Sequence, residues 1–288
     1  MEINGHTRML CLIGSPVDHS GSPAMYNYSF QKLGIDCAYL AYDIKEEETA
    51  EAIKALKLLN VKGFNITMPC KTQALSCCDE LSRAAELIGA VNTVVNVDGR
   101  LVGHNTDGLG WVRNCRENGF DITGKKMTIA GSGGAATAIE ITSALEGVRE
   151  MSIFALKDDF YANAEATVEK IRAHVPDCAV NLYDLADRET FYREIADSDI
   201  FTNATRVGMK PMDGQSLIED ASVFRPGLTV SDVVYNPRAT KLLVDAEAAG
   251  CKIIPGIGML LWQGAEAFKL YTGLEMPAAE VMDKYFSE

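Results

Sequence analysis

The feature that most constrains the fold is a glycine-rich turn between an apolar strand and an apolar helix. Residues 125–130 predict the strand, and an apolar helical pattern follows the turn to about Leu145. The turn between them consists of Gly131, Ser132, Gly133, Gly134, Ala135 and Ala136. This spacing fits G-x-G-x-x-G/A, in which the glycines allow a tight turn and a close backbone approach to a diphosphate. We therefore predict a dinucleotide-binding Rossmann unit; without its flanking strand and helix, the same turn would be a plain tight turn.

Short apolar runs alternate with helical patterns along the rest of the chain, which predicts an α/β fold. Before the turn, strands are expected at 9–13, 38–42, 63–66 and 92–97, and a helix at 46–59. After it, strands are expected at 151–156, 180–183, 199–203 and 229–234, and helices at 162–174, 238–249 and 257–271. The alternation predicts a doubly wound parallel sheet for the nucleotide domain, residues 107–256. Residues 1–106 with 257–288 would form an N-terminal α/β substrate domain, with a cleft between the two.

Composition places the chain among globular proteins. Its 288 residues are 47% hydrophobic and 23% charged, which suits folded domains and excludes a disordered, collagenous or coiled-coil chain. The net charge of −13 would repel a polyanion, so no nucleic-acid partner is expected. The apolar stretch at 9–13 is too short for a signal peptide, and we expect a cytoplasmic protein with no membrane partner.

The eight cysteines contain no C-x-x-C pair, and neither they nor the histidines have the spacing of a zinc site. We therefore expect reduced thiols and no metal.

Cofactor choice depends on the residues that follow the second strand of the nucleotide domain. That segment contains Lys157, Asp158 and Asp159 and no arginine. A carboxylate there bonds the ribose 2′-OH and disfavours a 2′-phosphate, which favours NAD over NADP. Two alternatives stay open: Lys157 could pair with a 2′-phosphate, or Asp158 or Asp159 could only cap the next helix.

Polar residues follow the strands of the first domain. Ser20 and Ser22 flank a glycine, where hydroxyls can bind a carboxylate; alternatively, Ser22 only caps the helix that Pro23 opens. Alternation along a strand places Asn65 and Thr67 on one face.

Three further residues are candidates for the chemistry. Pro69 is expected to start a short helix carrying Lys71, a candidate acid or base because desolvation lowers a lysine pKa toward neutrality. Asp107 stands where the chain passes to the second domain, as a reacting group or as an N-cap. Gln263 is a lone amide in an apolar helix, where it is either a ligand or a structural amide.

Together these motifs resemble the shikimate dehydrogenase family over nearly the whole chain. The shared motifs are S-x-S-P at 20–23, N-x-T-x-P-x-K at 65–71, G-A-V-N-T at 89–93, N-T-D-G-x-G at 105–110 and the glycine turn. The segments 207–211, 235–237 and 258–265 look most like the quinate/shikimate dehydrogenase branch.

The resemblance implies reversible NAD(P)-dependent hydride transfer at the C3 hydroxyl of shikimate or quinate. It implies that the substrate carboxylate is held by Ser20 and Ser22, the ring hydroxyls by Asn65, Thr67, Asn92 and Gln263, and the reacting hydroxyl by Lys71 and Asp107. Expected cofactor contacts beyond the glycine turn are Lys157, Asp158, Thr205, Val234 and Gly256. The family's Asn-Arg-Thr/Ser pattern for NADP is absent after the second Rossmann strand, which supports the preference for NAD.

Several alternatives stay open. Lys71 is either the general base or a charged stabiliser of the developing alkoxide. The enzyme could instead be a strictly NADP-dependent shikimate dehydrogenase, or the chain a binding protein that senses quinate or shikimate without turnover. The expected state is a monomer or a homodimer.

Overall fold

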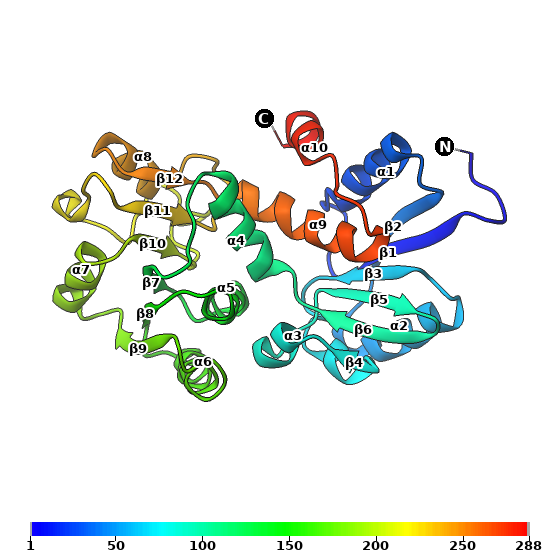
Figure 1. The fold of residues 1–288 in the computed structure, drawn as a ribbon, viewed down its shortest axis with the longest axis horizontal. Coiled ribbons are helices and arrows are strands. Elements are labelled where there is room, and N and C mark those ends of the chain that lie inside the picture. The colour runs from blue at the N-terminus through cyan, green and yellow to red at the C-terminus, as the bar shows by residue number, and fades with distance from the viewer. Residues whose placement is uncertain (1, 287–288) are drawn as a thin grey trace. The chain divides into compact units, whose positions relative to one another are not determined.

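The computed structural model describes residues 2–286, and the chain forms two compact units (Figure 1). The first unit comprises Met1–Thr106 with Gln263–Glu288, and the second comprises Asp107–Trp262. The chain returns to the first unit inside the helix α9 (Ile257–Thr272), later than the limit expected at residue 256. Among the described residues, no helix combines the length and apolarity needed to cross a bilayer.

The first unit contains a six-stranded sheet of order β2-β1-β3-β5-β6-β4. Its strands are β1 (Arg8–Gly14), β2 (Cys37–Asp43), β3 (Gly63–Ile66), β4 (Glu80–Leu81), β5 (Thr93–Val97) and β6 (Arg100–His104). Its other elements are α1 (Ser22–Leu33), η1 (Glu46–Glu48), α2 (Thr49–Leu58), η2 (Gln73–Cys77), α3 (Arg83–Ile88), part of α9 and α10 (Ala278–Tyr285).

The sheet of the first unit is mixed. Strand β1 is parallel to β2 and β3, whereas β5 is antiparallel to both β3 and β6. Asp98 and Gly99 both have positive φ values between β5 and β6, and such a pair matches the twist of a two-residue hairpin. Strands β4 and β6 were not among the expected elements.

Two apolar layers cover this sheet on opposite faces. Helix α2 supplies Ile53 and Leu56 to a core that includes Phe64 of β3. On the other face, α1 and α9 lie together (Figure 1) and contribute stacked aromatic rings. These rings, with that of β2, belong to Tyr26, Phe30, Tyr39, Phe268 and Tyr271. The central strands are thereby packed between two apolar layers.

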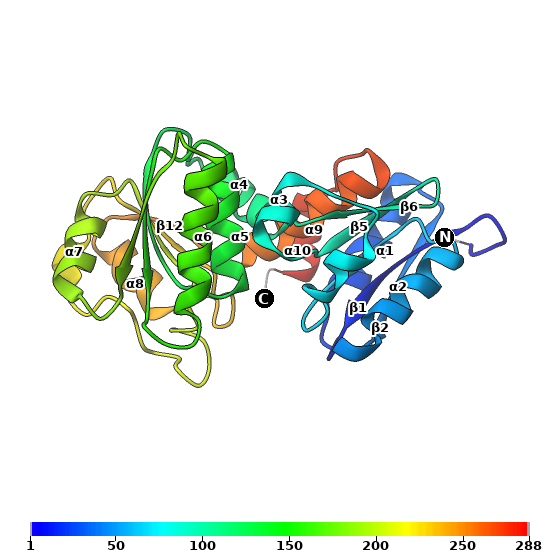
Figure 2. The ribbon, with the colours of Figure 1, turned by 90° about the horizontal axis from the view of Figure 1, so that it is seen from below.

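The second unit contains a fully parallel sheet of order β12-β11-β10-β7-β8-β9. Its strands are β7 (Lys126–Ala130), β8 (Glu150–Ala155), β9 (Ala179–Asp184), β10 (Ile200–Asn203), β11 (Thr229–Asp232) and β12 (Lys252–Ile254). Its helices are α4 (Asp107–Glu117), α5 (Gly134–Leu145), α6 (Tyr161–His174), α7 (Arg188–Ala196) and α8 (Lys241–Ala248), with η3 (Ala221–Val223) and the first part of α9. Helices α4, α5 and α6 lie on one face and α7 and α8 on the other (Figure 2).

The strand order of the second unit reverses at β7, with the later strands running outward on both sides of it. Ligands of open α/β sheets bind at such a reversal, outside the carboxyl ends of the strands. The doubly wound sheet predicted for this region is confirmed, and the glycine turn leaves the sheet at its reversal.

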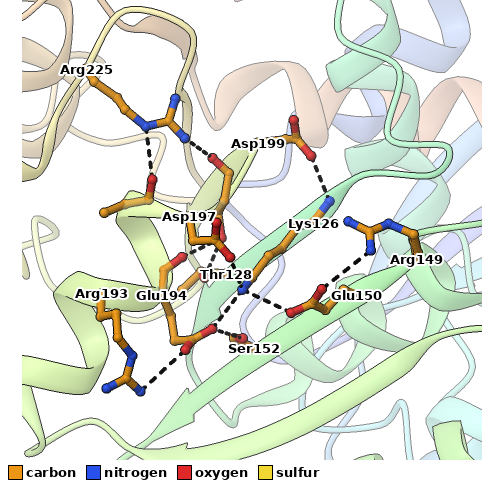
Figure 3. Close-up of polar contacts among 12 residues, drawn as sticks. Lys126, Thr128, Arg149, Glu150, Ser152, Arg193, Glu194, Asp197, Asp199 and Arg225 are labelled. Carbon is orange, nitrogen blue, oxygen red and sulfur yellow. Dashed lines mark hydrogen bonds and ion pairs between the residues drawn. The ribbon is translucent and has the colours of Figure 1, made fainter.

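The two ends of β7 differ in chemistry. At the carboxyl end stands Gly131, and at the amino end Lys126 lies among acidic side chains (Figure 3). Its Nζ atom is 3.0 Å from Glu150, 3.0 Å from Glu194 and 2.8 Å from Asp197. An ammonium group has three protons to donate, and here each has an acidic partner. The Lys126 side chain therefore has no donor left for any further group.

Two local expectations are corrected by the structure. The helix expected from residue 238 begins only at Lys241, because the Thr240 side chain accepts the Leu243 N–H and so caps it. Pro69 starts no helix: Lys71 lies in a turn, and η2 begins at Gln73.

Candidate active site

The glycine turn has the geometry of an anion-binding loop. Gly131 has a φ of +141°, and a Cβ atom there would lie 2.7 Å from the Ala204 carbonyl oxygen. A Cβ on Gly133 or Gly134 would instead meet nothing within 4 Å. Helix α5 begins here, and Gly133 at its N-cap offers no side-chain cap, so the first N–H groups stay available to an anion. The residues thus fit a bound diphosphate.

The other expected cofactor residues of this unit lie at the same edge of its sheet. Thr205 follows β10, and both its N–H and its hydroxyl donate to the Asn203 side-chain oxygen, at 3.1 and 2.7 Å. Val234 follows β11 and donates its N–H to Asp232 at 2.9 Å. Gly256 follows β12, and a Cβ there would lie 2.6–2.7 Å from the carbonyl oxygens of residues 232–234.

Asn203 and Asp232, which were not among the expected site residues, hold these loops. The Asn203 amide donates to Asp232 at 3.0 Å, and the Thr240 hydroxyl donates to the other Asp232 oxygen at 2.7 Å. Burial raises the pKa of Asp232 to about 6, although three donors partly offset that effect. The sequence did contain a signal for both residues. Each is a polar residue at the end of a strand, two positions before an expected cofactor contact.

The segment after β8 presents its charges to solvent. The Lys157 ammonium is exposed and lies 3.7 Å from the partly buried Asp184 of β9. Asp158 accepts the Phe160 N–H at 2.9 Å, and Phe160 occupies the N-cap of α6 without a side-chain bond. The alternative that Asp158 or Asp159 caps α6 is therefore wrong.

In the first unit, Ser20 and Ser22 lie at the start of α1. Gly21 is the N-cap and makes no side-chain bond, whereas Ser22 is already helical. The Ser22 N–H donates to the Ser20 hydroxyl oxygen at 3.3 Å. Since Ser22 is not the cap, the capping alternative does not explain its hydroxyl.

A buried network of neutral polar groups joins the strands β2, β3 and β5. Asn65 of β3 accepts the Tyr39 hydroxyl at 2.8 Å and donates to the Thr93 hydroxyl at 3.0 Å. Thr93 in turn donates to Asn92 at 2.9 Å. Asn92 accepts the Thr106 N–H at 2.9 Å, which is the backbone group just before Asp107. We call Tyr39, Asn65, Thr93, Asn92 and Thr106 the neutral network.

Lys71 is tied to this network through the backbone. Its carbonyl oxygen accepts the Val91 N–H at 3.0 Å, and Asn92 follows directly. Lys71 is half-buried. Thr67, at the end of β3, packs its methyl group closely against Gly14, whose φ of +150° excludes most side chains. Asn65 and Asn92 are therefore in direct contact, the backbone of Lys71 bonds the residue before Asn92, and Thr67 follows the same strand as Asn65.

Gln263 belongs to the same unit, in α9. The next residue, Gly264, accepts the Tyr26 hydroxyl at 3.0 Å, and a Cβ on it would lie 2.4 Å from Met25. This close packing fixes the helix turn of Gln263 against α1. Asp107 is the first residue of α4 and of the second unit.

Among residues 2–286, no three His, Cys, Asp or Glu side chains converge in a way that could hold a metal ion. The eight cysteines are free thiols.

Comparison with known proteins identifies the family. Residues 12–94 match the shikimate dehydrogenase substrate binding domain, and residues 256–284 match the shikimate 5′-dehydrogenase C-terminal domain. A shikimate dehydrogenase (NADP(+)) of Listeria monocytogenes is 53% identical over 284 residues, which cover 99% of this chain and 97% of the relative.

Solved structures agree. Shikimate 5-dehydrogenase from Listeria monocytogenes, in complex with shikimate and NAD, is 53% identical with a TM-score of 0.96 and covers 98% of both chains. Quinate dehydrogenase from Corynebacterium glutamicum, in complex with NAD, is 31% identical with a TM-score of 0.87 and covers 98% of this chain and 99% of that one. The chain, with its substrate-binding unit and its Rossmann-type nucleotide-binding unit, belongs to the shikimate dehydrogenase family of oxidoreductases.

Proposed function

We propose that this protein is a shikimate dehydrogenase that reversibly oxidises the C3 hydroxyl of shikimate, and also of quinate, with a nicotinamide dinucleotide as hydride acceptor. The observation that carries the proposal is the neutral network, which holds Asn65 and Asn92 beside the Lys71 turn and extends to the residue before Asp107. The 53% identity to a shikimate dehydrogenase supports the same substrate.

The proposed roles follow from the chemistry of the side chains. The hydroxyls of Ser20 and Ser22 hold the substrate carboxylate at the start of α1. The ring hydroxyls are bound by Asn65, Thr67, Asn92 and Gln263. These hydrogen bonds fix the orientation of the ring, so that the bound substrate presents its reacting carbon in a defined position.

Lys71 and Asp107 are the proposed catalytic pair. The hydroxyl proton must leave as hydride leaves the carbinol carbon, and a positioned acid–base group lowers that barrier. Lys71 accepts the hydroxyl proton during oxidation and returns it during reduction, or, as an ammonium group, it stabilises the developing alkoxide while Asp107 or water takes the proton. Asp107 orients the Lys71 ammonium and the hydroxyl. A nicotinamide bound at the glycine turn supplies the hydride-accepting carbon.

The proposed cofactor is NAD rather than NADP. Asp158 leaves a carboxylate in solvent after β8, and Lys157 is already paired with Asp184. A ribose 2′-OH suits that setting better than a 2′-phosphate. One relative is named for NADP(+) and one related structure holds NAD, so the assay below compares both dinucleotides.

A spectrophotometric assay at the reduced-nicotinamide band tests the proposal by crossing shikimate and quinate with NAD and NADP. We expect turnover of shikimate, with a higher kcat/KM for NAD. A higher kcat/KM for NADP would favour the strictly NADP-dependent enzyme instead. Tight binding of either acid without any hydride transfer would support a sensing protein and overturn the catalytic proposal.

Cytoplasmic location and the monomeric or homodimeric state stay predictions.

A further inference from the structure

A buried tyrosine that no proposed catalytic role uses lies directly behind Asn65. Tyr39 is in the middle of β2 and is 0% exposed. Its hydroxyl donates to the Asn65 side-chain oxygen at 2.8 Å. Its ring stacks on Tyr26 with the centroids 4.5 Å apart. Burial raises the pKa of Tyr39 well above its usual range, so the phenol keeps its proton.

The backbone of Tyr39 is held as firmly as its ring. The Asn27 side chain of α1 accepts the Tyr39 N–H at 2.8 Å and donates to the Tyr39 carbonyl oxygen, also at 2.8 Å. The ring is held by stacking on Tyr26, and the backbone is held by the two hydrogen bonds with Asn27. The direction of the phenol donor is therefore fixed.

The partners of Asn65 determine which way its amide faces. Its nitrogen donates to the Thr93 hydroxyl at 3.0 Å and to the Asn92 carbonyl oxygen at 3.3 Å. A side-chain amide has two N–H donors and an oxygen with two acceptor positions. Both donors are thus used inside the protein, and Tyr39 occupies one acceptor position of the oxygen. The Asn65 side chain can therefore accept one more hydrogen bond, at the second acceptor position of its oxygen.

We propose that Tyr39 is a positioning residue that presents Asn65 to the substrate as a hydrogen-bond acceptor. This inference rests on the proposed function. Asn65 then selects a ring hydroxyl that donates its proton. The ketone formed by oxidation has no proton to donate, so the hydroxyl on Asn65 is one of the ring hydroxyls that is not oxidised.

The variant Tyr39→Phe tests the inference because it removes the donor and keeps the ring. Without the phenol, the Asn65 amide can rotate and lose its alignment. We expect the KM for shikimate to rise about tenfold, the effect of losing roughly one hydrogen bond. The kcat and the KM for the dinucleotide should change by less than about twofold, because Tyr39 touches neither reacting group.

Tyr271→Phe is the matched control. Tyr271 is buried in the same aromatic cluster, and its hydroxyl makes no hydrogen bond of normal geometry, although it lies near Thr93. Its removal should leave the KM for shikimate unchanged. If both variants lower thermal stability but neither moves KM, Tyr39 is only structural and the inference is overturned.

A double-mutant cycle makes the test specific for Asn65. In an Asn65→Ala background, Tyr39→Phe should produce no further rise in KM. Additive effects of the two changes on KM would mean that Tyr39 does not act through Asn65.

Substrate analogues test the hydrogen-bond direction on the wild-type enzyme, even if Tyr39→Phe fails to fold. At one of the positions C4 and C5, replacement of the hydroxyl by hydrogen and by fluorine should raise KM equally, because neither substituent donates. A fluoro analogue that binds clearly better than the deoxy analogue at both positions would show that the protein donates there. If wild-type protein does not oxidise shikimate at all, the proposed function fails, and the inference falls with it rather than by these results.

Discussion

The two units each contain a buried polar network, and the two networks differ in charge and in place. The neutral network of the first unit consists of amides and hydroxyls beside the Lys71 turn. The Lys126 cluster of the second unit joins one ammonium to Glu150, Glu194 and Asp197, at the opposite end of β7 from the glycine turn (Figure 3).

The two networks differ in whether they have a hydrogen-bonding position left for a ligand. The Lys126 ammonium has a partner for each of its protons, so it has nothing left to offer a ligand. Burial alone would lower the pKa of Lys126, but its bonds to Asp197, Glu150 and Glu194 outweigh that effect and raise it. Asn65, by contrast, retains an acceptor position beside the residues expected to bind substrate. The proposed substrate site therefore uses the network that still has a free acceptor position.

The largest effect is expected at Lys71, beside the neutral network. Lys71→Ala should lower kcat by about 10²–10⁴-fold, the contribution of a positioned acid–base group, with a much smaller change in the KM for shikimate. Steady-state kinetics of the variant measures both constants. The exposed Lys54 on α2 supplies the control, since Lys54→Ala should leave kcat unchanged. A Lys71 variant with near-normal kcat would remove this residue from the mechanism.

Glu140, a buried acid of the second unit without hydrogen-bond partners, contrasts with both networks. Glu140 of α5 is 0% exposed, neither of its carboxylate oxygens has a hydrogen-bond partner, and burial raises its pKa to about 8. Because the folded pKa lies above the ordinary value of 4.5, the folded state binds the extra proton and stability falls as pH rises from 4.5 to 8.

Glu140→Gln should remove this pH dependence. The stability gain of the variant over wild type should grow by about 4 kcal/mol between pH 5 and pH 8, at about 1.4 kcal/mol per pH unit. Urea unfolding at the two pH values measures the difference. Parallel stability curves for the two proteins would show that Glu140 ionises in the folded state as it does in water.

Lys126→Met should destabilise the second unit by about 2 kcal/mol, because it leaves the partly buried carboxylates of Glu150 and Glu194 without their cation. The kcat and KM of the folded enzyme should be unchanged, because Lys126 bonds only to acidic residues of its own cluster and not to a ligand. Lys125→Met is a suitable control: the Lys125 ammonium is 3.8 Å from Asp199 and exposed, so its loss should cost less than about 1 kcal/mol. If Lys126→Met lowered kcat at full folding, the separation of support from binding would fail.

The smallest effect is expected at Ser22. Ser22→Ala should raise the KM for shikimate about tenfold and lower kcat less, because it removes roughly one hydrogen bond to a charged carboxylate. The test is a substrate titration at saturating cofactor. A variant whose kcat falls while KM holds would assign the Ser22 hydroxyl a role other than anchoring.

Regular patterns made most of the fold predictable. The glycine turn marked the start of α5, and apolar runs located five strands of the second sheet to within a few residues, whereas β12 was not expected. The hairpin partner β6 was missed, although Asp98-Gly99 is a recognisable turn signal. A two-residue turn is short, and the polar and charged residues around it obscured the apolar alternation.

The site was predictable where a motif is contiguous and not where contacts are distant in sequence. Lys71 was identified next to its strand, although the expected helix proved to be a turn. Tyr39 gave no signal, because its partner Asn65 lies 26 residues away. Asn203 and Asp232 are each recognisable as a polar residue at a strand end, but the hydrogen bond that joins them spans 29 residues and gave no signal. Such pairs depend on strand order, which local patterns do not contain.

The Asn27 amide has a consequence for the outer margin of the first sheet. Strand β2 is the terminal strand, and the Asn27 side chain bonds both the N–H and the carbonyl of its residue Tyr39. An additional strand would need those same two groups in order to pair there. One side chain of α1 therefore ends the sheet, and a foreign peptide would have to displace it before joining this edge.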